Sequence, residues 1–174
     1  MKKVWVLTAV LMVAALTVFG ATALATGANG DKRFSTKLTG FQEVPSISTG
    51  ARGTFRAKLV DDTLEYTLSY SGIEGGTAVF AHIHLGQRGV NGGVAAFLCG
   101  GGDKPACPAT AGTVTGVIDP ADVIGPAAQG IAPGEFDELV TAMRAGVTYA
   151  NVHSMGATPP LPSFPGGEIR GQIR

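Results

Sequence analysis

Two adjacent segments of the chain, residues 53–60 and 63–70, alternate between apolar and polar side chains. This two-residue period predicts half-buried β-strands, because successive side chains on a strand point to opposite faces. Asp61 and Asp62 form a short polar connection between the segments, so we expect a tight hairpin. The apolar positions that we expect in the core are Phe55, Leu59, Leu64, Tyr66 and Leu68.

Further segments that favour strands are separated by Gly- and Pro-rich turns. They are residues 34–40, 77–85, 93–99, 113–118, 147–153 and 167–174. Such a chain is typical of an all-β fold, an antiparallel β-sandwich or barrel. One exception is residues 134–145, where apolar residues recur at helical spacing and predict a short helical crossover. Just upstream, Asp119 as N-cap and Pro120 at the first position predict a short helical turn.

The first residues have the features of a secretory signal peptide, which we assign to residues 1–25. A basic MKK is followed by an apolar run and by the small residues ATALA. A membrane anchor is the alternative, since the apolar run approaches the length of a short transmembrane helix. The polar TGANGDKR that follows favours cleavage and a secreted protein. Residues 26–32 then form a flexible leader, and residues 33–174 form one domain.

Charge and cysteine content narrow the set of partners. The formal net charge is zero and no basic patch stands out, so nucleic acid is not an expected partner. No apolar run after the signal peptide is long enough to span a bilayer, so we expect no membrane association after its removal. Cys99 and Cys107 bracket a Gly-rich loop, and export favours a disulfide bond between them. The alternatives are two free thiols or a metal site.

The chain has only three histidines, and two of them lie one residue apart. His82 and His84 in AHIHL point the same way on a strand, and by alternation Ala78 and Phe80 share their face. Their backbones are about 7 Å apart, which lets both imidazoles reach one metal ion. A third ring, from His153 in YANVHS, would complete a three-nitrogen set suited to copper or zinc. The alternative is that these are ordinary histidines on half-exposed strands.

Several motifs together resemble the CHRD domain, the module named after chordin. They are the opening TGFQEVP, then AHIHLGQRGVNGGV, then LVTAMRAGVTYANVHS and the terminal PGGEIRGQIR. The resemblance covers residues 33–174 and implies an immunoglobulin-like or superoxide-dismutase-like β-sandwich that also contains the strand of His153. The chain departs from the family in a longer linker at residues 154–165 and in the local elaboration CGGGDKPAC, and both could alter access to a site near the histidines.

Four more residues are candidates for outer partners of the histidines. Glu168 could steady a ligand ring, as could Arg170, although we favour an ordinary cross-strand charge pair for Arg170. Asn151 shares the face of His153 by alternation. Glu43 in FQEVP is either a polar partner near the site or an edge-strand or turn residue.

These observations leave three classes of function. The first is a non-catalytic module that binds copper or zinc through His82, His84 and His153, or that binds another molecule. The second is an extracellular protein-binding or structural domain without metal, since the resemblance to chordin implies an interaction role. The third, which we rank last, is a mononuclear copper enzyme. A strand with H-x-H in a secreted sandwich is similar to superoxide dismutase, but the chain has too few histidines for the two-metal site of that enzyme.

Overall fold

The computed structural model describes residues 32–156 and 163–174, so the predicted signal peptide and residues 26–31 of the leader lie outside the described residues. The described part contains eight strands, one α-helix and three short 3₁₀ turns. The strands are β1 (Arg33–Thr39), β2 (Arg52–Val60), β3 (Thr63–Ser71), β4 (Thr77–Leu85), β5 (Gly93–Cys99), β6 (Gly112–Ile118), β7 (Thr148–Met155) and β8 (Phe164–Gln172). The prediction of an all-β antiparallel fold with one short helix is confirmed.

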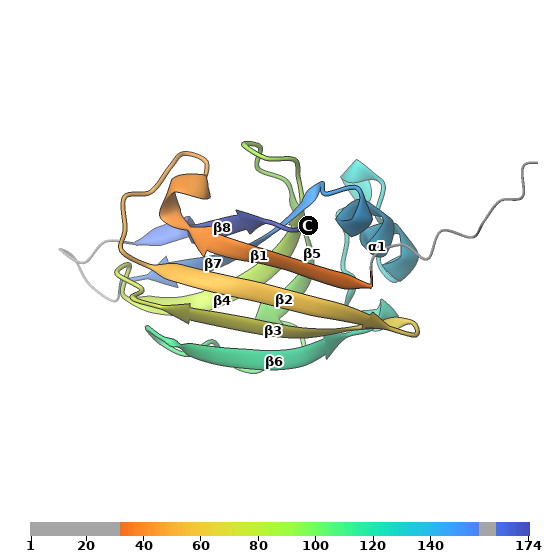
Figure 1. Cartoon of the computed structure of the whole chain (residues 1–174), viewed down its shortest axis with the longest axis horizontal. Coiled ribbons are helices and arrows are strands. Elements are labelled where there is room, and N and C mark those ends of the chain that lie inside the picture. The colour runs from red at the N-terminus through yellow and green to blue at the C-terminus, as the bar shows by residue number, and fades with distance from the viewer. Residues whose placement is uncertain (1–31, 157–162) are drawn as a thin grey trace, which may run out of the picture.

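The strands form one continuous sheet that folds over on itself. The order is β5-β4-β7-β8-β1-β2-β3-β6, and every neighbouring pair is antiparallel. The ladder between β1 and β8 contains one residue pair, Thr39 with Arg170, and the backbones of Ser35 and Arg174 exchange two further hydrogen bonds. Figure 1 shows the result as two layers, with β1, β2, β3 and β6 in one and β4, β5, β7 and β8 in the other.

The predicted hairpin joins β2 and β3 through a turn at Asp61 and Asp62. Its apolar face lies in the core between the layers, where Phe55, Leu64 and Leu68 have no exposed surface. Tyr66 extends from β3 across the core, and its hydroxyl donates to the carbonyl oxygen of Leu98 in β5 at 2.7 Å. A buried hydroxyl needs such a partner. This bond therefore ties one layer to the other.

The helical residues also lie close to their predicted positions. Helix α1 (Phe136–Arg144) buries Phe136, Leu139, Val140 and Met143, and it closes one end of the sandwich (Figure 1). Asp119 caps the turn η2 (Pro120–Asp122), with its carboxylate accepting from the Ala121 amide. Cys99 and Cys107 lie at disulfide distance, with Cα atoms 5.1 Å apart. Among the residues that the structure describes, no helix has the length and apolar character needed to cross a membrane.

One predicted facing is wrong. Ala78 does not share the face of Phe80, because the pairing of β4 with β7 shifts register between these two residues. Ala78 is buried in the core at 3% exposure, whereas Phe80 is 40% exposed on the other side. A bulge inserts an extra residue and so reverses the alternation on one side of it. The alternation from Phe80 to His84 is unaffected.

Candidate metal centre

The three histidines lie on the face of β4 and β7 that points away from the sandwich core. His82 pairs with Asn151, His84 with Tyr149, and Phe80 with His153. On the next strand, Arg170 pairs with Asn151. Antiparallel partners opposite each other point to the same side. The outer face of β4, β7 and β8, called the polar face below, therefore carries His82, His84, Tyr149, Asn151, His153, Arg170 and Gln172.

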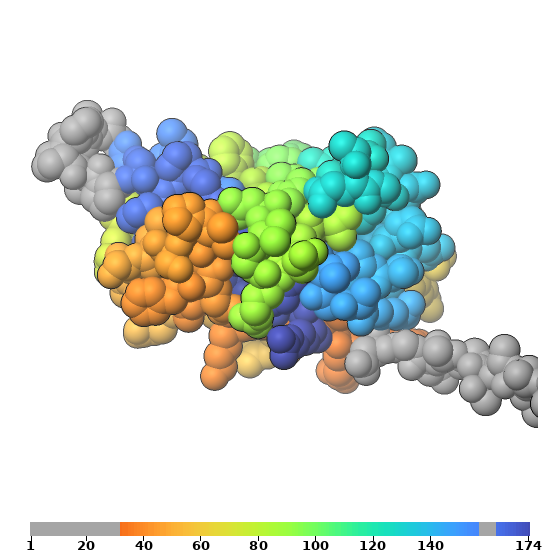
Figure 2. All heavy atoms as spheres, turned by 90° about the horizontal axis from the view of Figure 1, so that it is seen from above, coloured from red at the N-terminus to blue at the C-terminus, as the bar shows by residue number. Residues whose placement is uncertain are grey.

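This polar face is buried, although it is not part of the core. Each of its members is less than 10% exposed. Two loops cover it: residues 40–46, which begin with the turn η1 (Gly40–Gln42), and residues 86–92 between β4 and β5. They lie side by side in Figure 2, in orange and green, and the Asn91 side-chain amide joins them by donating to the Val44 carbonyl at 2.9 Å. Side chains that would normally meet water are thus enclosed.

The ring nitrogens of the three histidines converge. Nδ1 of His82 lies 3.0 Å from Nε2 of His153. One nitrogen from each of His82, His84 and His153 can be chosen so that all three lie within 4.8 Å of one another. The structure therefore brings together the three residues that sequence reasoning singled out.

Two of the three rings are held in a defined tautomer. Nδ1 of His84 lies 2.9 Å from the carbonyl oxygen of Gly92, and Nδ1 of His153 lies 2.8 Å from that of Pro165. A carbonyl oxygen can only accept, so each Nδ1 carries the proton and each Nε2 presents a lone pair. Nε2 of His84 is buried and has no hydrogen-bond partner in the part of the chain that the structure describes. Gly92 and Pro165 act through their backbones, so no side-chain pattern could reveal them.

Burial keeps the three imidazoles neutral. It lowers the pKa of His82 to about 3, with the neighbouring His153 and His84 adding to the effect. Burial also lowers the pKa of His84 to about 4, against the opposing hydrogen bond to Gly92. The pKa of His153 is lowered by burial as well. All three rings are therefore neutral imidazoles at neutral pH, each with one nitrogen lone pair, and this is the form that binds a metal.

An aromatic and cationic stack supports His84 from behind. The Tyr149 ring lies parallel to the His84 ring, with centroids 4.7 Å apart and a 4° angle between the planes. The guanidinium carbon of Arg170 lies 3.4 Å from the centre of the Tyr149 ring. Arg170 in turn donates to the carbonyls of Gln87 and Val90 and to the side chain of Asn91. The 86–92 loop, the tyrosine and the histidine are thus one packed unit.

The cross-strand charge pair favoured for Arg170 is not formed. Within residues 32–156 and 163–174, the ion pairs are those of Lys104 with Asp103 and Asp122. Arg170 instead extends along the polar face to the 86–92 loop. There it donates hydrogen bonds to two backbone carbonyls and to the side chain of Asn91. Charge alternation along β8 could not reveal this, because the partners come from a loop that is distant in sequence.

Of the candidate outer partners, Asn151 lies at the histidines. Its Oδ1 is 3.1 Å from Nε2 of His153. Glu43 lies on the far side of Asn151, and an ideal Cβ placed on Gly167 would collide with both Oε1 of Glu43 and Nδ2 of Asn151. Burial raises the pKa of Glu43 to about 7, with the Arg170 charge opposing that rise, and its Oε1 has no hydrogen-bond partner.

Glu168 lies apart from the ring nitrogens and forms no hydrogen bond with any of the three histidines. Its carboxylate accepts from the side chains of Thr49 and Ser154 and from the backbone amides of Glu74 and Gly75. These bonds tie the loops before β2 and β4 to the end of β7. Because Ser154 adjoins His153, Glu168 supports the backbone at the site rather than a ring.

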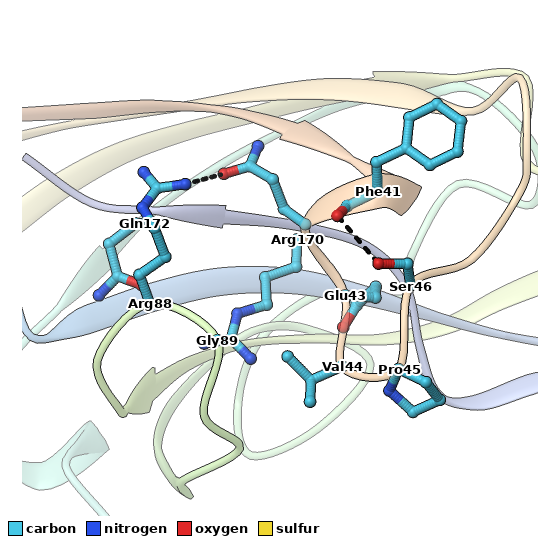
Figure 3. A pocket seen from close by; sticks show the side chains of 10 residues that line it. Phe41, Glu43, Val44, Pro45, Ser46, Arg88, Gly89, Arg170 and Gln172 are labelled. Atoms are coloured by element: carbon cyan, nitrogen blue, oxygen red, sulfur yellow. Dashed lines mark hydrogen bonds between the residues drawn. The ribbon is translucent and has the colours of Figure 1, made fainter.

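A pocket of about 410 Å³ lies beside the polar face, between the two covering loops. Figure 3 shows Arg170 and Glu43 inside it and Phe41 projecting from the rim, where Phe41 is 73% exposed. The pocket reaches the histidines only indirectly, through the stack of Arg170 on Tyr149.

The comparisons with known proteins agree with the motifs. The chain has no match among curated proteins or among solved structures. A family model described as the CHRD domain matches residues 34–173, which is nearly the whole of the described chain. The chain therefore belongs to the CHRD-domain family.

Proposed function

We propose that this protein is a secreted, non-catalytic module that binds one copper or zinc ion through His82, His84 and His153. Residues 1–25 would direct its export, in keeping with the paired cysteines of the domain. Nδ1 of His82 and Nε2 of His84 and His153 would hold the ion. The module would store, carry or sense the metal without turning over a substrate.

The observation that carries this proposal is the buried, unpaired Nε2 of His84 beside a second Nε2 lone pair on His153. An unpartnered buried polar atom is costly, so it needs a reason. A metal-binding histidine typically donates its other ring N–H to a carbonyl or carboxylate. His84 and His153 both do so, which orients their Nε2 lone pairs before any ion arrives. An ion would replace the contact of Nε2 of His153 with Nδ1 of His82.

The chemistry of the set favours soft-to-borderline divalent metals. Neutral imidazole suits copper and zinc, whereas calcium and magnesium prefer oxygen ligands. Copper is slightly preferred over zinc, since divalent copper binds nitrogen ligands more tightly. His82 can join the set as the Nε2–H tautomer, which frees its Nδ1 to bind the ion.

The test is a copper and a zinc titration of the untagged mature protein beside His84→Ala, at neutral pH. We expect one ion per chain for the wild type and a loss of at least about tenfold in affinity for the variant. Arg56→Ala, an exposed change on β2, is the control and should bind as the wild type does. Equal affinity of the wild type and His84→Ala would refute the shared site.

An interaction module without metal is the second candidate. It is favoured by Phe41, which is 73% exposed at the rim of the pocket between the two loops. Elemental analysis of the untagged protein, purified without chelator, separates the two candidates. One equivalent of copper or zinc supports the metal site, whereas metal-free protein that cannot be loaded leaves the interaction role.

A further inference from the structure

The side chain of Asn151 is 2% exposed and lies directly opposite His82 in the β4–β7 ladder. Its Oδ1 faces Nε2 of His153 at 3.1 Å. That nitrogen carries no proton, because Nδ1 of the same ring donates to the Pro165 carbonyl. An amide oxygen has no proton either. Two acceptors thus face each other in a buried place. Nδ1 of His82, 3.0 Å from Nε2 of His153, offers that nitrogen one proton, whereas a bound cation would satisfy both acceptors.

The orientation of the amide is supported from its other side. An ideal Cβ on Gly167 would lie 2.9 Å from Nδ2 of Asn151 and still closer to Oε1 of Glu43. The amide nitrogen therefore lies on the side of the Glu43 carboxyl, and the oxygen lies on the side of the rings. Exchanging the two atoms would turn the carbonyl oxygen toward Glu43, whose Oε1 is already unpaired.

We propose that Asn151 is a fourth metal ligand, through its Oδ1, rather than an outer partner of His153. This inference rests on the proposed function and deepens it. The donor set becomes three imidazole nitrogens and one amide oxygen, all from β4 and β7. A set of four protein ligands is the pattern of closed sites, whereas catalytic sites keep a position open for water or substrate. With this fourth ligand the centre is a closed site, which binds the ion and leaves no position open for a substrate.

The experiment is electron paramagnetic resonance of the Cu²⁺-loaded mature protein, comparing the wild type with Asn151→Asp and Asn151→Leu. In Asn151→Asp a carboxylate oxygen replaces the amide oxygen, so copper stays bound and its parallel hyperfine splitting changes. In Asn151→Leu the oxygen is lost, and we expect the affinity to fall by more than about tenfold together with a changed spectrum. Melting of each variant in chelator reports folding separately, and Asn151→Asp decides the question if Asn151→Leu does not fold.

Gln87→Glu is the matched control. It places the same new charge on the exposed part of the 86–92 loop, where the backbone carbonyl of Gln87, and not its side chain, accepts from Arg170. Its copper spectrum should superimpose on that of the wild type. Wild-type spectra from both Asn151 variants would overturn the role of Asn151 and leave the three-histidine site standing. A wild-type protein that binds no copper would overturn the site itself.

Discussion

The two faces of the layer formed by β4, β7 and β8 are both buried, but they are built differently. The inner face carries Ala81, Ile83, Ala150, Val152 and Ile169, none of which is exposed. The outer face carries the polar face defined above, enclosed by two loops. An apolar face is stabilised by any close packing, whereas each buried polar atom needs a specific partner.

The two faces differ in how many buried polar atoms lack a partner, and this difference indicates where a ligand would bind. Among the described residues of the inner face, one buried polar side-chain atom, Oγ1 of Thr148, has no hydrogen-bond partner. On and beside the outer face three such atoms have none: Nε2 of His84, Oε1 of Gln172 and Oε1 of Glu43. Enclosing such groups under loops costs stability that an ordinary solvated face would not lose. In the proposed function, a bound cation would offset that cost at His84.

The largest effect on stability is expected from the inner face. Ile83→Ala removes buried carbon atoms between His82 and His84 without touching the polar face, and we expect a loss of about 2–5 kcal/mol in the free energy of unfolding. Metal affinity, measured well below the melting temperature, should stay close to the wild-type value. Urea unfolding checks the expected loss of stability, and a copper titration checks the unchanged affinity. An affinity loss as large as that of His84→Ala would show that the two faces are not independent.

A smaller effect is expected from Arg170→Met on the polar face. The substitution keeps an unbranched apolar stem but removes three hydrogen bonds and the cation from the Tyr149 ring. Because the freed acceptors belong to a loop that water can reach, we expect a loss of only about 2–3 kcal/mol.

For Arg170→Met, hydrogen exchange of the 86–92 loop should accelerate. Metal affinity should fall about 10- to 100-fold, because the Tyr149 ring that stacks on His84 loses the guanidinium group that holds it in place. Arg56→Met, exposed on β2, is the control for loss of charge. If hydrogen exchange of the loop and metal affinity were both unchanged in Arg170→Met, the 86–92 loop would not support the histidine site.

The smallest effect is expected from Glu43→Gln, and it depends on pH. The folded pKa of Glu43 is about 7, above its ordinary value of 4.5, because burial disfavours the charged form. The folded state therefore binds more protons than the unfolded state between these values, and the wild type loses stability as pH rises through them. Glutamine does not titrate, so Glu43→Gln should gain about 1–2 kcal/mol relative to the wild type between pH 5 and pH 8. A difference that stays constant over this range in chemical unfolding would contradict the shift.

The fold could be predicted because its information is local. Alternation in residues 53–70 predicted the hairpin and its buried face, and the H-x-H pattern placed His82 and His84 on one side. Alternation failed at Ala78, where a bulge that no residue type announces reverses the facing. It also could not show that the polar face is covered, because covering depends on loops that return from elsewhere in the chain.

The grouping of the three histidines could be predicted, but the groups that support them could not. Counting histidines was enough to group His82, His84 and His153, since a small set on paired strands has few alternatives. The carbonyls of Gly92 and Pro165, which set the tautomers, carry no residue-specific signal. Arg170 and Glu168 were recognised as polar positions on β8, but their partners lie in loops up to 119 residues away in sequence. Long-range contacts of this kind are visible only in three dimensions.

The central claim is that the lone pairs on the polar face hold one metal ion, and anomalous X-ray diffraction from copper-loaded crystals tests it most directly. We predict a single strong anomalous peak about 2.0–2.1 Å from Nδ1 of His82 and from Nε2 of His84 and His153. The claim would be contradicted by crystals of the copper-soaked protein that diffract well but show no anomalous density among the three rings.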